Sequence, residues 1–192
     1  MTSYMLSAPV LEPVTLEETK EFLRVDGNDE DNFIISLIAG ARLHVESITG
    51  RALISQTWRI ICDDFPKNRV VNLPVAPLIS ISEINVYDSD GNATSLALAQ
   101  FQPETKVNPA RIYLPAIIDG LPSLRERAAV EIDYVAGFGA TSSDVPNDLK
   151  QALFSLIAYW FEHRDAVIIA GSGAVVPAGF DQLIAAYRGV RI

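Results

Sequence analysis

Hydrophobic and polar residues in the first quarter of the chain recur with the period of two consecutive helices. Thr15 is a suitable N-cap for the first helix, and Glu18 completes the pattern of a capping box. A longer second helix is predicted to start at Asn28 or Asp29 and to end at Gly50. Its apolar positions are expected to hold it to the core: Phe33, Ile34, Leu37, Ile38, Ala41, Val45 and Ile48.

From residue 55 onward the periodicity changes to the alternation that is typical of strands. Segments rich in branched and aromatic residues are separated by Pro, Gly, Asn and Asp: residues 56–61, 69–73, 79–87, 93–98, 111–114 and 128–134. The last segment alternates most clearly, with Val130 and Ile132 on one face and Glu131 and Asp133 on the other. Residues 88–92 are predicted to form a hairpin turn. We therefore expect a small antiparallel sheet or sandwich inserted between helices.

Helical periodicity returns after Pro146, a residue type that suits the first position of a helix. The apolar face of this third helix is wide: Leu149, Ala152, Leu153, Leu156, Ile157, Trp160 and Phe161. Residues 170–179 are small and contain few polar side chains, so they are predicted to be a hinge or arm. A short amphipathic segment follows, with Phe180, Leu183, Ile184 and Tyr187 as its apolar residues.

These patterns predict an α+β fold with an N-terminal helix pair, a central small antiparallel sheet or sandwich, and a long C-terminal helix. A flexible tail with a short amphipathic helix completes it. In terms of domains, residues 1–54 and 143–166 are expected to form a helical core and residues 55–142 a β-rich insertion. Residues 167–192 are expected to form a flexible C-terminal arm.

Composition and charge narrow the possible functions. Hydrophobic residues make up 49% of the chain, which favours a packed core over disorder. No apolar run is long enough for a transmembrane helix, and residues 1–10 lack the features of a signal peptide. We therefore expect the protein to be made in a cytoplasm. The formal net charge of −9 argues against a nucleic-acid-binding surface, which needs clustered Lys and Arg.

No pattern of catalytic, metal-ligating or cofactor-binding residues emerges. The acidic segment 88–92 resembles a calcium loop, but alanine occupies the positions where such a loop needs glycine and glutamate. The single cysteine, Cys62, is expected to be a small buried apolar residue. His44 and His163 are too few for a histidine-rich metal site, and neither is expected to be catalytic. We therefore expect no enzymatic activity, no cofactor and no metal.

The order of these parts resembles the head–tail connector, or adaptor, proteins of long-tailed phages and of gene transfer agents. The likeness spans nearly the whole chain, and it rests on the order and spacing of short motifs. These are PVTLEE at residues 13–18, LRVD at 23–26, DED at 29–31, IA at 38–39, TGR at 49–51, QTW at 56–58, Pro74, PL at 77–78, YVAGFG at 134–139, VP at 145–146 and YWFEHR at 159–164.

The resemblance implies a structural protein in the neck of a phage or phage-like particle, synthesised in the bacterial cytoplasm. About twelve copies would form a ring between the portal and the stopper or tail proteins. The ring would extend the DNA channel, and carboxylates lining it would repel the phosphates of the passing duplex. The duplex would pass without sequence-specific binding, and no membrane would be involved.

The resemblance also implies that the C-terminal arm, residues 180–192, reaches the portal. The apolar anchors would be Phe180, Leu183, Ile184 and Tyr187, and Arg188 and Arg191 would pair with acidic residues of the portal.

Two alternatives remain open at this point. The first is a stopper or tail-completion protein of the same particle. The second is a small enzyme that uses carboxylates alone, since residues 1–50 hold nine acidic and three basic side chains. Against the enzyme, no pair of carboxylates lies at helical spacing beside a plausible base.

Overall fold

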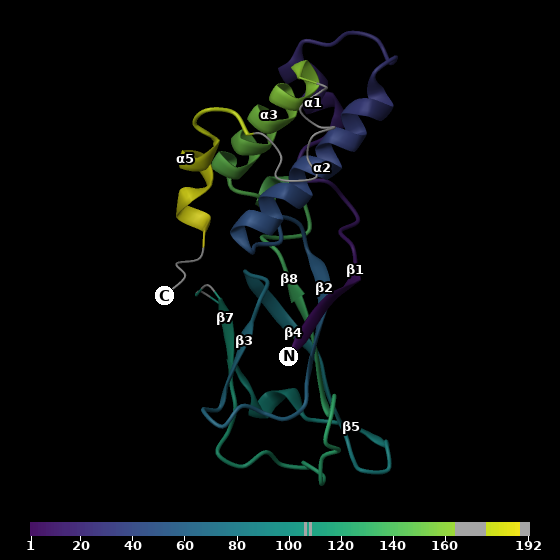
Figure 1. The fold of residues 1–192 in the computed structure, drawn as a ribbon, viewed down its shortest axis with the longest axis vertical. Helices are drawn as coiled ribbons and strands as arrows, with labels where there is room; N and C mark the ends of the chain where they lie inside the picture. The colour runs from purple at the N-terminus through teal and green to yellow at the C-terminus, as the bar shows by residue number, and fades with distance from the viewer. Residues whose placement is uncertain (106, 108, 164–175, 189–192) are drawn as a thin grey trace. The chain divides into compact units, whose positions relative to one another are not determined.

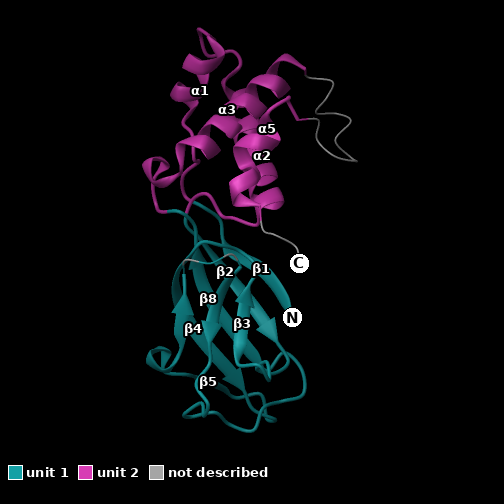
Figure 2. Ribbon diagram, turned by 90° about the vertical axis from the view of Figure 1, so that its left-hand side faces the viewer, with its two compact units in different colours: residues 1–9, 55–138 teal, residues 10–54, 139–192 magenta. Residues whose placement is uncertain are grey.

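The computed structural model describes residues 1–105, 107, 109–163 and 176–188 (Figure 1). These residues form two compact units, which Figure 2 shows in different colours. Unit 1 comprises Met1–Pro9 and Ser55–Phe138, and unit 2 comprises Val10–Ile54 and the described part of Gly139–Ile192. Unit 1 contains the strands and unit 2 contains the α-helices. The predicted α+β fold is therefore confirmed.

Unit 1 consists of two small antiparallel sheets and a short 3-10 helix, η1 (Leu98–Gln100). The five-stranded sheet has, in spatial order, β1 (Thr2–Ser7), β2 (Gln56–Cys62), β8 (Val130–Ala136), β4 (Leu78–Tyr87) and β5 (Ala93–Ser95). The three-stranded sheet has β3 (Val70–Leu73), β7 (Ala110–Tyr113) and β6 (Gln102–Glu104).

The core of unit 1 follows from the alternation along its strands. In β8, Val130 and Ile132 are fully buried, whereas Glu131 and Asp133 lie on the opposite face and form ion pairs with Arg59 of β2. Both sheets contribute fully buried side chains: Ile60, Ile84 and Ile132 from the larger sheet, and Leu73 and Ile112 from the smaller. Burying each such side chain contributes about 1.5–3 kcal/mol.

The first strand, β1, corrects the expectation that residues 1–54 belong to a helical core. Thr2–Ser7 pairs antiparallel with β2 at the edge of the larger sheet. Five of its six residues are exposed, so its sequence shows no alternation between apolar and polar positions. An edge strand of this kind is determined by the partner strand beside it rather than by its own pattern.

Unit 2 contains the helices α1 (Leu16–Leu23), α2 (Asp31–Thr49), α3 (Asn147–Glu162) and α5 (Phe180–Ile184). Two short 3-10 helices, η2 (Ser142–Asp144) and η3 (Ala185–Tyr187), complete it. Figure 1 shows α3 lying between α2 and α5. No helix within the described residues combines the length and apolarity that crossing a membrane would require.

The capping box at the start of α1 is confirmed. Thr15 Oγ1 accepts a hydrogen bond of 3.1 Å from the Glu18 amide, and the Glu18 carboxylate accepts one of 2.8 Å from the Thr15 amide. Gly50 ends α2 in the left-handed conformation, as predicted. The start of α2 differs, because Glu30 occupies its N-cap position without a side-chain bond. The side chain of Asn28 instead accepts a hydrogen bond from Lys20 Nζ.

Apolar faces of α2 and α3 form the core of unit 2. The buried apolar residues are Ile34, Leu37, Ile38, Ala41 and Val45 from α2, and Leu149, Ala152, Leu153, Leu156, Ile157 and Trp160 from α3. Three residues expected in this core, Phe33, Ile48 and Phe161, are only half-buried. Phe33 packs against Phe161 of α3, with ring centroids 5.9 Å apart.

The described part of the predicted C-terminal arm is packed against unit 2. Residues 164–175 and 189–192 lie outside the described residues, so the structure bears only on 176–188 of the arm. Within that part, Phe180 and Ile184 are fully buried and α5 contacts α3. Residues 180–187 therefore differ from the free segment that the sequence suggested, because their apolar side chains complete the core of the helical unit.

Candidate assembly surfaces

The predicted portal-contact residues lie in and just after α5, and their environments differ. Phe180 packs against the His44 ring at a centroid distance of 5.9 Å, and Ile184 is buried beside it in the same core. Leu183 is half-buried, whereas Arg188 is exposed and forms an ion pair of 2.5 Å with Asp181. The structure thus places two of the predicted anchors inside unit 2 and leaves the others at its surface. Arg191, the remaining predicted residue, lies outside the described residues.

Tyr187 connects the end of α5 to two other parts of unit 2. Its hydroxyl donates to the Asp148 carboxylate at 2.8 Å, and its carbonyl accepts a hydrogen bond of 3.0 Å from Arg51 Nε. Burial and the neighbouring Asp148 carboxylate raise the pKa of Tyr187 to about 12. The Arg51 guanidinium also lies over the tyrosine ring, 5.5 Å from its centroid. These contacts hold the C-terminal segment on the helices.

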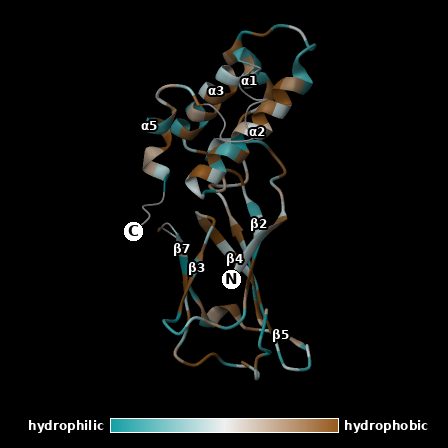
Figure 3. Cartoon of the chain, in the orientation of Figure 1, coloured by the Kyte–Doolittle hydropathy of each residue, from teal (hydrophilic) through white to brown (hydrophobic). Residues whose placement is uncertain are grey.

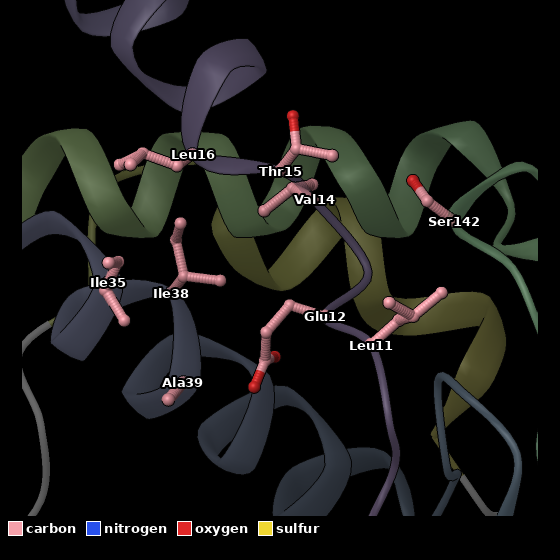
Figure 4. A pocket seen from close by; sticks show the side chains of 9 residues that line it. All are labelled: Leu11, Glu12, Val14, Thr15, Leu16, Ile35, Ile38, Ala39 and Ser142. Carbon is pink, nitrogen blue, oxygen red and sulfur yellow. The ribbon is translucent and has the colours of Figure 1, made fainter. Parts of the chain in front are cut away.

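A second surface feature is an apolar recess between α2 and the segment that leads into α1 (Figure 4). Its volume is about 300 Å³, and its apolar lining residues are Leu11, Val14, Leu16, Ile35, Ile38 and Ala39. Leu11 and Ile35 are 53% and 49% exposed, which is high for side chains of this size. We call this feature the α2 recess. The apolar surface extends along α2 to Leu43, which is 54% exposed.

Polar contacts hold the walls of the α2 recess in place. Arg42 Nε contacts the Glu12 carboxylate at 2.8 Å, and its Nη1 contacts Glu46 at 3.1 Å. Burial opposes the charge of Arg42, but the two carboxylates outweigh it and raise the pKa of the guanidinium. Ser142 Oγ donates to the Pro13 carbonyl at 2.7 Å. The segment before α1 is thereby tied to both α2 and η2.

A third feature lies where α1 meets α3. Phe22 of α1 stacks on Phe154 of α3 with ring centroids 5.1 Å apart and an interplanar angle of 19°. Phe22 is 44% exposed, so the pair presents an aromatic surface to its surroundings. Lys150 of α3 contacts Glu18 of α1 at 3.3 Å and joins the same two helices. We call this feature the Phe22–Phe154 pair.

Unit 1 has its own exposed apolar surface in the loop after β7. Ile117 is 80% exposed, and Leu121 in the same loop is also exposed. Both line an open groove of about 590 Å³ whose rim includes the exposed cations Lys67 and Arg69. This groove combines exposed apolar and basic side chains.

The two histidines pack against aromatic side chains, and the single cysteine is half-buried. Burial lowers the pKa of His44, and its ring packs edge-on against Trp160. His163 stacks on Tyr159 at the end of α3, with ring centroids 4.4 Å apart. Burial raises the pKa of the Cys62 thiol, which disfavours the reactive thiolate. Among the described residues, no group of three or more His, Cys, Asp or Glu side chains is placed to hold a metal ion.

The acidic segment 88–92 is the turn between β4 and β5. Asp88 Oδ1 accepts hydrogen bonds of 2.9 Å from the amides of Asp90 and Asn92. The Asp88 carboxylate is therefore used inside the turn, and the hydrogen bonds from the Asn92 side chain and from these amides lower its pKa. The prediction of a hairpin turn in place of a calcium loop agrees with this geometry.

Sequence reasoning did not single out the α2 recess or the Phe22–Phe154 pair. One signal for the recess is present in the sequence: Ile35, Ala39 and Leu43 recur every four residues beside the core stripe of the same helix. The rest of the recess brings together residues from three separate segments. That part becomes visible only in the folded chain.

Comparison with known proteins identifies relatives over most of the chain. Residues 12–173 match the family described as head completion protein. No curated protein matches the chain. Among solved structures, a chain in the neck of an empty gene transfer agent particle, computed with sixfold symmetry, is 29% identical with a TM-score of 0.84. A chain in the virion of a native gene transfer agent particle is 30% identical with a TM-score of 0.81.

A third solved structure, the neck of a native gene transfer agent particle computed with twelvefold symmetry, contains a chain 28% identical with a TM-score of 0.76. Each of these three matches covers 100% of this chain and 97% of the matched chain. The resemblance to head–tail connectors that was drawn from sequence motifs is confirmed. The chain belongs to the head completion protein family.

Proposed function

We propose that this chain is a structural subunit of the neck of a gene transfer agent or related phage-like particle. The observation that supports this most strongly is the full-length likeness to chains in gene transfer agent necks, at 28–30% identity. Its family membership and the structural positions of its histidines and cysteine fit a role without catalysis.

In this role the subunits form a closed ring between the portal and the stopper or tail proteins. The related necks were computed with sixfold and twelvefold symmetry, and a ring of about twelve copies is compatible with both. Exposed apolar surfaces in both units supply contacts for neighbours and partners.

The ring extends the DNA channel, and the charge of the chain suits that task. With a net charge of −9 per subunit, a channel wall made from these chains repels phosphate over about one Debye length, roughly 8 Å at physiological salt. Duplex DNA then moves through the ring without adhering to it. No sequence-specific contact with the duplex is part of this proposal.

The C-terminal segment, residues 180–192, is proposed to contact the portal. Leu183 and Arg188 are accessible for this contact in the present conformation, and Tyr187 is half-buried. Phe180 and Ile184 would act as anchors only if α5 left its position on α3, because both are fully buried there. The contact by the surface residues needs no such rearrangement.

Electron microscopy of particles from a strain that lacks this gene tests the proposal. We expect filled heads without attached tails, and restoration of complete particles when the gene is supplied in trans. In restored particles the chain should be found in the neck as a symmetric ring. Complete particles that lack the chain, or that contain it outside the neck, would refute the proposal.

Capture experiments distinguish an adaptor from a stopper or tail-completion protein of the same particle. Immobilised chain is incubated separately with purified portal and with purified tail components. An adaptor retains the portal, and loss of this retention on deletion of residues 180–192 supports the proposed contact. A chain that retains tail components but not the portal is instead a stopper or tail-completion protein.

A further inference from the structure

Two exposed apolar features of unit 2 lie on different faces of α1. The α2 recess is concave and includes Leu16 at the start of α1. The Phe22–Phe154 pair lies on the side of α1 that meets α3. Leu16 and Phe22 are six residues apart in one helix, which separates their directions by about 120° around the axis. Unit 2 thus presents a hollow on one side and an aromatic surface on another.

The α2 recess lacks an apolar partner within the described residues of unit 2. Its side chains from α2 and from the segment before α1 face a shared open space in Figure 4. Ile35 and Leu43 are each about half exposed along one side of α2. Contiguous apolar surface of this kind marks an interaction site. The ion pairs of Arg42 with Glu12 and Glu46 hold the site in shape before any partner arrives.

The Phe22–Phe154 pair has the properties expected of an anchor. Large aromatic side chains dominate the energetics of protein interfaces when they enter a pocket of the partner. Stacking on Phe154 restricts the rotation of Phe22, so less conformational entropy is lost on binding. Arg24, the C-cap residue of α1, has an exposed side chain. Its charge suits Glu12, the carboxylate that lines the recess.

The geometry of a closed ring indicates that a second copy of the chain occupies the recess. In a closed ring of more than two copies, each subunit contacts its neighbours through two different surfaces. The two surfaces must fit each other, so a concave surface on one copy needs a different, protruding surface on the next copy. We propose that the Phe22–Phe154 pair of one copy inserts into the α2 recess of the next copy. This inference rests on the proposed ring, and it names the residues that form the contact between its subunits.

Site-directed cross-linking in purified particles tests this contact. Because Cys62 is the single cysteine of the chain, Cys62→Ser gives a chain without thiols. In that background Phe22→Cys and Ile35→Cys are combined in one chain, and particles are treated with a short bismaleimide. Denaturing gels should then show a ladder of dimers, trimers and higher multimers. Each single-cysteine chain alone should remain monomeric.

Mixed particles add a quantitative criterion. When the two single-cysteine chains are produced together, one copy of each can be joined, but no further link can form. The expected product is a dimer without higher multimers. A dimer formed by either single-cysteine chain alone would instead indicate a contact between identical surfaces and would overturn the proposal.

A matched control uses Ile117, which is more exposed than Phe22 but lies in unit 1. The combination Ile117→Cys with Ile35→Cys should give no ladder, which excludes reactivity at any exposed position as the explanation. Particles that contain the double-cysteine chain in the neck but give only monomers would refute this contact and leave the proposed function standing. Complete particles without the chain would refute the proposed function itself.

Discussion

Two tyrosines with raised pKa values make the folding stability of this protein depend on pH in the alkaline range. Burial raises the pKa of Tyr134 to about 12, and burial together with Asp148 raises that of Tyr187 to about 12. An unfolded chain titrates its tyrosines near pH ~10. Their neutral phenols therefore stabilise the fold fully below pH ~10, and this contribution is lost as pH rises towards the folded pKa.

For Tyr187→Phe, which lacks the titrating group, we expect a smaller loss of stability between pH 10 and 12 than for the wild type. The hydrogen bond to Asp148 is also removed, so the variant should be less stable at pH 8 by about 0.5–1.5 kcal/mol. Urea denaturation at both ends of this pH range measures the two effects. Parallel pH profiles for the two proteins would contradict the role of this hydroxyl.

The Thr15 cap provides a second prediction for a single residue. Thr15→Ala removes the hydroxyl that accepts the Glu18 amide hydrogen bond, and we expect a loss of about 1 kcal/mol in unfolding free energy. Thr15→Ser retains the hydroxyl and serves as the control. Urea titration followed by circular dichroism should rank the three proteins as wild type, serine and alanine. Equal stability of the alanine and serine variants would show that the cap contributes nothing.

Residue-level predictions from the sequence succeeded where the cause is local. The capping box at Thr15 involves residues within one turn, and the stop at Gly50 depends on the conformational freedom of one residue. The predicted start of α2 at Asn28 or Asp29 differs from the structure, in which the helix begins at Asp31 and the Asn28 side chain accepts a hydrogen bond from Lys20 of α1. A contact between different elements thus replaced the local one.

At the level of elements, α5 packs on α3 and is proposed to contact the portal, and separate variants can distinguish these two roles. Phe180 is fully buried, and Phe180→Ala should destabilise the protein by about 3–5 kcal/mol. Leu183 lies on the same short helix but is half-buried, so Leu183→Ala should change stability less and portal capture more. Thermal unfolding and retention of the portal on immobilised chain measure these effects. If both variants lose only stability, α5 has no part in the portal contact.

Elements with strong periodicity were predicted well, and those without it were not. The alternation in β8 and the apolar faces of α2 and α3 correspond to the buried sides of these elements. Strand β1 is mostly exposed and β6 has only three residues, so neither has a pattern from which it could be recognised. The apolar residues of α5 were identified, but their burial depends on the position of α3. Periodicity alone does not supply that information.

At the level of the whole molecule, the net charge of −9 predicts weak affinity for nucleic acid. We expect no binding to a fluorescent duplex of 30 base pairs at micromolar protein concentration and 100 mM salt. A channel component must leave DNA free to move, so this result follows from the proposed role. Saturable binding under these conditions would argue against a passive channel.

The resemblance to connectors supplied this role, whereas the α2 recess was not predicted, because its lining comes from three segments.

The same charge determines how assembly of the chain should depend on salt. Subunits that each bear a net charge of −9 repel one another, while the proposed contact through Phe22 and Ile35 is apolar. Added salt screens the repulsion and leaves apolar contacts intact. We therefore expect self-association, measured by sedimentation velocity, to strengthen from 50 to 500 mM sodium chloride. Ile35→Asp should abolish this gain, whereas Ile117→Asp in unit 1 should retain it. Association that weakens with salt would show that ion pairs, rather than apolar surfaces, hold the copies together.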